Sequence, residues 1–97
     1  MKHYNELMKD SKDLIEKLEK VNTINEYGNL APLFQKVIAE HMMYCDALKE
    51  ALRTRKLTPI ECMTIQNILE EIQYNVKKIM ELNAKAGKDL FGIEMGT

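Results

Sequence analysis

Apolar residues recur at intervals of three and four along most of the chain, which is the period of an amphipathic α-helix rather than of a β-strand. A first helix is predicted from about residue 2 to 22, with Lys and Glu opposite a single apolar stripe. Ser11 falls in the centre of that stripe, whose other members are Tyr4, Leu7, Met8, Leu14, Ile15, Leu18 and Val21. The Asn, Thr and Gly residues after Val21 predict a connection.

A second helix is predicted from about residue 30 to 55, because Pro32 is tolerated only in the first turn of a helix. Its stripe is Leu30, Phe34, Val37, Ile38, His41, Tyr44, Cys45, Leu48 and Leu52. The sequence Thr-Ile-Asn-Glu at residues 23–26 has the spacing of a capping box, so a short helical turn starting there is kept as an alternative.

A third helix is predicted over residues 59–86 and has the clearest start signal. Thr58 can cap it, Pro59 takes the first helical position and Glu61 completes a capping box. The stripe continues through Ile65, Ile68, Leu69, Ile72, Val76, Ile79, Met80 and Ala86 to Gly87, the predicted C-cap. The tail, residues 87–97, still contains Leu90, Phe91, Ile93 and Met95, so we expect an apolar latch that folds back or docks into another chain.

Short connections between three such helices predict an all-α fold with a single domain over residues 1–97, an up-down-up antiparallel three-helix bundle. Cys45 and Cys62 are expected at different levels of the second hairpin, reduced and unbridged. Off the stripes lie Met42, Met43, Met63, Ile60 and Tyr74, which are hard to bury in a three-helix monomer. A homodimer interface and a groove for a partner protein are both open explanations for them, whereas Met8 and Met80 are expected to fill gaps in the core.

Charge narrows the choice of partners. The chain has 14 basic and 15 acidic residues, a formal net charge of -1, which gives no reason to expect nucleic acid or an anionic membrane as the main partner. No apolar run has the length of a membrane span or the form of a signal peptide, so we expect a cytoplasmic protein. Lys49, Arg53, Arg55 and Lys56 could bind phosphate, but a solvated cluster that complements a helix C-terminus is the favoured interpretation.

Catalytic and metal chemistry find little support. Ser11 and His41 are predicted at the same level of two neighbouring helices, as a nucleophile and base would be. Nothing is placed to orient the imidazole, so a buried hydrogen bond that fixes helix register is favoured. Glu40 and His41 are adjacent and point about 100° apart, which disfavours a shared metal ion. We therefore predict no enzyme activity, no catalytic residue, no metal and no cofactor.

The stretches LAPLFQKVIAEHMMYCDAL and LTPIECMTIQNILEEIQYNVKKIMELNAKAGKDL, after a long first helix, resemble the small flagellar type III export chaperones of the FliT and FlgN type. The resemblance spans most of the chain and rests on helix lengths, the Leu-Thr-Pro-x-Glu start and the runs ILEEI and VKKIMELN. It implies a cytoplasmic chaperone that binds a helical segment of an exported filament protein and keeps it soluble for export. The end AGKDLFGIEMGT departs from the family pattern, in which the helix continues.

The resemblance places client binding on the third helix and the segment after it, at Ile68, Ile72, Val76, Ile79, Leu82, Leu90 and Phe91. An amphipathic client helix would lay its apolar face in a groove that three helices leave incompletely filled. The alternative function is a structural or regulatory homodimer without a separate client.

Overall fold

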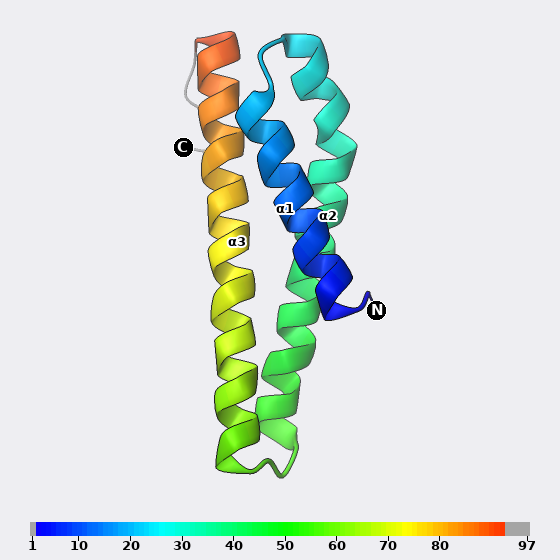
Figure 1. The fold of residues 1–97 in the computed structure, drawn as a ribbon, viewed down its shortest axis with the longest axis vertical. Helices are drawn as coiled ribbons and strands as arrows, with labels where there is room; N and C mark the ends of the chain where they lie inside the picture. Colours follow the sequence, from blue (N-terminus) through cyan, green and yellow to red (C-terminus); the bar gives the residue numbers. More distant parts are fainter. Residues whose placement is uncertain (1, 93–97) are drawn as a thin grey trace.

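The computed structural model describes residues 2–92, and within that range it contains three α-helices and no strand. Helix α1 spans Tyr4–Lys20, α2 spans Ile24–Thr54 and α3 spans Pro59–Phe91. They run up, down and up in an elongated three-helix bundle with extents of 50 × 25 × 16 Å (Figure 1). The predicted all-α architecture and its antiparallel order are confirmed.

The three helices differ in length, and this shapes the molecule. Helix α1 has 17 residues, whereas α2 has 31 and α3 has 33. It starts about midway along the α2–α3 hairpin and runs toward the end where α2 begins (Figure 1). We call residues 46–68, which lie beyond the buried Cys45 and Leu69 in the cluster with Leu7 of α1, the hairpin end. Over most of this segment α2 and α3 pack against each other without a third helix.

The core consists of two buried clusters along the seam of the three helices. One contains Leu7, Cys45, Leu69 and Ile72, and the other contains Leu14, Leu18, Val37 and Ile79. The predicted stripes supply every one of these residues, because a 3.6-residue period brings each stripe to the same seam. Met80 is an exception to the prediction: 51% of it is exposed, because it lies about 100° around α3 from the buried Ile79.

Helix α2 begins six residues earlier than the predicted start at residue 30. The Thr23 hydroxyl accepts a hydrogen bond from the Glu26 backbone N–H at 3.1 Å, and the Glu26 carboxylate in turn accepts from the Asn22 N–H at 3.3 Å. This cap offsets the effect of Pro32, which lies inside α2. The carbonyl that loses its helical donor to Pro32 belongs to Gly28, which is exposed to water.

Helix α3 ends five residues later than predicted. Gly87 is buried within the helix, and the C-cap is Gly92, which has a φ of 71° and donates its N–H to the Lys88 carbonyl at 2.7 Å. The helix continues because the Phe91 ring packs on Tyr27 of α2, an apolar contact four residues past Gly87. Leu90 and Phe91 therefore belong to α3 rather than to a tail. Ile93 and Met95 lie outside the described residues, and the latch predicted for them stays a prediction.

The two ends of α3 are held in different ways, the first by a local cap and the second by contacts with α2. At its start the capping box of Thr58 and Glu61 is present, and the hydrogen bond from the Thr58 N–H lowers the pKa of the Glu61 carboxyl. At its end the Phe91 ring meets the Tyr27 ring edge-on at a centroid distance of 5.9 Å. The Tyr27 hydroxyl also donates to the Asn83 carbonyl at 3.3 Å.

No helix in the described range is both long and apolar enough to cross a bilayer.

Candidate functional site

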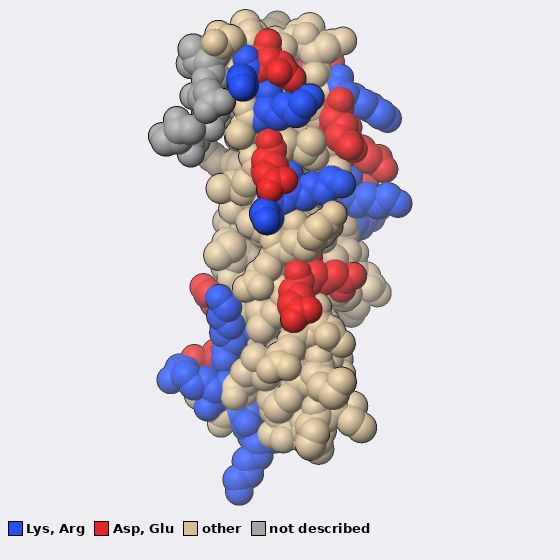
Figure 2. All heavy atoms as spheres, turned by 90° about the vertical axis from the view of Figure 1, so that its left-hand side faces the viewer, with Lys and Arg blue, Asp and Glu red and all other residues tan. Residues whose placement is uncertain are grey.

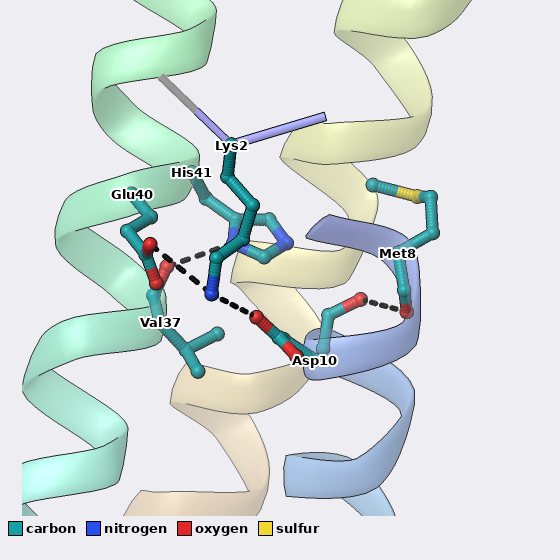
Figure 3. Close-up of polar contacts among 7 residues, drawn as sticks. Lys2, Met8, Asp10, Val37, Glu40 and His41 are labelled. Carbon is teal, nitrogen blue, oxygen red and sulfur yellow. Dashed lines mark hydrogen bonds and ion pairs between the residues drawn. The ribbon is translucent and has the colours of Figure 1, made fainter. Parts of the chain in front are cut away.

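Charged side chains meet where the start of α1 crosses α2 (Figure 3). The Lys2 ammonium lies 2.6 Å from the Asp10 carboxylate and 3.2 Å from the Glu40 carboxylate. The hydrogen bond to Asp10, followed by that to Glu40, raises the pKa of Lys2, because both favour its charged form. These contacts join the segment before α1 to both α1 and α2, and they fix where α1 begins on the hairpin.

Ser11 and His41 are both buried near this cluster, but they do not bond to each other. The Ser11 hydroxyl donates to the Met8 carbonyl at 2.9 Å and accepts from the Asn75 amide at 3.2 Å. The Nδ1 atom of His41 lies 2.7 Å from the Val37 carbonyl, one turn earlier in α2. The structure therefore forms no nucleophile–base pair from these two residues. It also corrects the predicted role of His41 in helix register, because its hydrogen bond stays within one helix.

The other ring nitrogen of His41 has no partner. Nε2 is buried and without a hydrogen bond in the described part of the chain. Because Nδ1 faces a carbonyl oxygen, it carries the proton of the neutral ring and Nε2 is the unpaired acceptor. Burial lowers the pKa of His41, against the opposing effect of the Val37 carbonyl and the Asp10 and Glu40 carboxylates. His41 is thus a neutral core residue near pH 7.

Asn75 makes the polar contact between helices that sequence reasoning assigned to His41. Its amide group reaches Ser11 and also lies 3.3 Å from the Met8 sulfur, so it ties α3 to α1. Asn75 is half-buried and lies one position before Val76 of the predicted stripe. The sequence signal that identifies Asn75 is an uncharged polar residue beside an apolar stripe. It lies level with Ser11 in the stripe of the first helix.

The candidate metal ligands do not converge. Within residues 2–92, no group of three His, Cys, Asp or Glu side chains is placed to hold a metal ion. Glu40 points toward Lys2, whereas His41 points into the core (Figure 3). Cys45 and Cys62 are both free, and burial raises the pKa of the Cys45 thiol, which disfavours its reactive thiolate form.

The residues predicted to bind a partner fall into three environments. Ile72 and Ile79 are 0% exposed and lie in the two core clusters. Ile68, Val76 and Leu82 are half-buried and pack against the same clusters. A partner could reach Ile72 and Ile79 only by displacing α1 or α2, whereas Leu82 lines the same groove as Leu90. The remaining two, Leu90 and Phe91, lie in the last turn of α3, where Leu90 faces a groove and Phe91 faces Tyr27.

That groove separates the end of α1 from the last turns of α3, and we call it the C-terminal groove. Its volume is about 540 Å³. The α1 side and the segment after it supply Leu18, Glu19, Val21 and Asn22, and α3 supplies Leu82, Lys85, Ala86, Asp89 and Leu90. The apolar residues form its floor, and the exposed Glu19 and the Lys85–Asp89 pair, 3.4 Å apart, form its charged rim.

The hairpin end exposes apolar side chains of a different kind. Ile60 is 76% exposed and Met63 is 62% exposed. Outside the hairpin end, Met42, Met43 and Tyr74 are also exposed, and all five were predicted to lie off the stripes. A shallow hollow of about 370 Å³ runs along α2 at the hairpin end, lined by Lys2, Tyr44, Ala47, Leu48, Ala51 and Arg55. It continues the line of α1 past its first residue, since the Tyr4 ring of α1 packs at a tilt against the Tyr44 ring, with a centroid distance of 6.2 Å.

The basic residues at the end of α2 are all exposed. Arg53 pairs with Glu50 in the same helix, and Arg55 is the C-cap of α2. This arrangement agrees with a solvated cluster that complements the helix C-terminus.

Comparisons of the chain with protein-family models, curated proteins and solved structures found no match. The geometry of the two surfaces therefore carries the functional proposals below.

Proposed function

We propose that this protein is a cytoplasmic helical adaptor or export chaperone, without catalytic activity, that binds an amphipathic helix of a partner protein and keeps it soluble. The observation that carries the proposal is the C-terminal groove, an apolar channel with a charged rim between two helices. Helix-in-groove recognition uses surfaces of this kind, with client side chains spaced at three and four residues entering the apolar floor.

The groove favours a short amphipathic contact. Leu82, Ala86 and Leu90 follow one another at intervals of four along α3, which sets one apolar row about 12 Å long. A client helix would place about three apolar side chains against this row, with its polar face toward water. A contact of this size supports micromolar rather than nanomolar binding.

The resemblance to flagellar type III export chaperones adds a candidate client, the helical C-terminal segment of an exported filament protein. The fold agrees with that resemblance at the level of three long amphipathic helices. Two of the residues that the resemblance implies, Leu82 and Leu90, line the groove.

Affinity capture from a lysate of the source cell tests the proposal, followed by binding of a synthetic peptide. The baits are the full chain, a chain that ends at Gly92, a Leu90→Asp variant and a Leu57→Asp control at the opposite end of the molecule. Ending the chain at Gly92 keeps all of α3, whereas ending it at Gly87 would also remove Leu90.

We expect the first two baits and the Leu57→Asp control to recover the same protein, and Leu90→Asp to lose it. A peptide from its predicted amphipathic helix should bind with a micromolar Kd, at least about tenfold weaker for Leu90→Asp. The proposal is wrong if Leu90→Asp, shown to be folded by circular dichroism, binds the peptide as well as the full chain does. It is also wrong if every bait recovers only the protein itself.

A further inference from the structure

The hairpin end has the construction of half a helix bundle. The ring of Tyr4, the first residue of α1, packs at a tilt against the Tyr44 ring, and its hydroxyl donates a hydrogen bond to the Glu71 carboxylate. Helix α1 therefore starts level with these two residues. Burial, with the hydrogen bond to Glu71 adding to it, raises the pKa of Tyr4 to about 12 and keeps this donor protonated. Beyond this level, about ten residues of α2 and twelve of α3 project without a third helix, roughly 15 to 18 Å.

The α3 side of the projection has few charges. Between Glu61 and Glu70, α3 carries no charged residue, and the exposed Ile60 and Met63 lie at its start. On α2 the hollow contains the small Ala47 and Ala51, which allow a second helix to approach closely. Figure 2 shows a broad uncharged area in the lower half of the α3 side, with basic side chains along one edge and at the lowest point.

Opposite charges border this uncharged face at its two ends. Glu70 and Glu71 are exposed at its upper border, near the start of α1. Arg55 and Lys56 are exposed at the tip of the hairpin, directly after α2 ends. One chain therefore carries both members of a complementary pair, separated by the length of the projection.

We propose that the hairpin ends of two copies of this chain dock antiparallel, each filling the space beyond α1 of the other. A two-fold axis across the middle of the projection brings the basic tip of one copy to the acidic border of its partner, and the reverse. The projecting segment of one copy has the same length as the uncovered surface of its partner, because the same residues form both. The overlap is an antiparallel four-helix bundle.

The size of the overlap sets the expected strength. Two helices, each about 10 Å wide and 18 Å long, give a footprint of roughly 360 Å², below the 800 Å² per partner of a standard stable interface. A micromolar dissociation constant is expected, so the dimer should depend visibly on concentration.

Sedimentation velocity of the full chain, from about 1 to 500 µM, tests the dimer with two variants of matched chemistry. Ala47→Glu places a charge in the hollow, and Ala39→Glu places the same charge on the same helix outside the hairpin end; both alanines are exposed, so neither change opens the core. We expect a micromolar Kd for the full chain and for Ala39→Glu, and a Kd at least about 30-fold higher for Ala47→Glu. A full chain that stays monomeric over this range, or two variants that behave alike, overturns the proposal.

Charge reversal tests the antiparallel orientation. Glu70→Lys and Arg55→Glu each place like charges against each other in a pair of identical copies, whereas a mixture of the two variants restores opposite charges at both contacts. Each variant alone should associate at least about fivefold more weakly than the full chain, and the mixture should recover the affinity. A mixture that associates no better than its components overturns the antiparallel arrangement.

Discussion

The two ends of this bundle use the same pair of helices in different ways. We call the end where α1 packs on α2 and α3 the covered end, and there Leu14, Val37 and Ile79 are almost completely buried. At the hairpin end the same pair lacks its third helix, and side chains that continue the stripes, such as Leu52 and Ile65, remain half-buried. The difference shows that an apolar stripe gives a core only where a third helix closes the seam.

Charge follows the same division along α3. Between Pro59 and Val76 the helix has no Lys or Arg, whereas its second half contains Lys77, Lys78, Lys85 and Lys88. The covered half of α3 therefore presents basic side chains to water, whereas its first half presents none. An uncovered surface with few charges is typical of an interface, which is why we propose association at the hairpin end and client binding in the C-terminal groove.

The sharpest way to break this comparison is to remove the same side-chain volume at both ends. Ile79→Ala should lower the free energy of unfolding by about 3 kcal/mol, because the fully buried side chain leaves a cavity. Ile65→Ala should lower it by only about 1 kcal/mol at low protein concentration, because its surroundings are already partly solvated. Urea titrations followed by circular dichroism give both values. Equal losses would mean that the hairpin end is as well packed as the covered end.

Helical periodicity predicted the stripes and hence the whole core, because burial against a common seam is a property of each helix by itself. The start of α3 was predicted to the residue, since the Thr58 capping box is local. The end of α3 was not, because the signal of Gly87 as a C-cap was overridden by the contact of Phe91 with Tyr27 of α2, which no local pattern shows.

The candidate sites divide in the same manner. His41 and Ser11 were predicted at the seam, but their partners, Val37 and Asn75, depend on rotamers and on helix register. The hairpin end is uncovered because α1 is short. How much shorter α1 is than α2 became clear only once the start of α2 was known. Sequence patterns alone therefore showed which residues lacked a place in the core without showing where they gather.

The burial of His41 at the covered end predicts how the free energy of unfolding depends on pH. Its folded-state pKa lies below the usual value of about 6.5, so the unfolded chain binds a proton first as pH falls. The contribution of neutral His41 to stability is complete above about pH 6.5 and is lost as pH falls below it, at up to about 1.4 kcal/mol per pH unit.

A His41→Leu variant removes the titrating group and keeps the site apolar. Urea titrations at pH 7.5, 6.5 and 5.5 should show the full chain losing more stability than the variant over this range, before most carboxylates titrate. Parallel pH profiles for the two proteins would contradict the buried, neutral state of His41.

The Ser11–Asn75 contact tests whether a polar link fixes α1 on the covered end. Asn75→Ala should lower the free energy of unfolding by about 1 kcal/mol, and a double-mutant cycle with Ser11→Ala should give a coupling of about 0.5 to 1.5 kcal/mol. Asn67→Ala is the matched control, because this exposed asparagine lies on the same helix at the hairpin end and should change stability by less than about 0.5 kcal/mol. A coupling near zero would leave apolar packing alone to position α1.

Two glycines at the covered end give the smallest expected effects, with opposite signs. Gly28 lies within α2, and a Cβ atom added there meets nothing within 4 Å, so Gly28→Ala should stabilise the protein by about 0.5 to 1 kcal/mol through helix propensity. Gly92 has a φ of 71°, which L-residues adopt at a cost, so Gly92→Ala should destabilise it by about 1 kcal/mol. Thermal unfolding should therefore shift Tm by several degrees in opposite directions. Because both residues lie far from the hairpin end, neither change should alter the monomer–dimer Kd, and a shift in that Kd would place part of the association surface at the covered end.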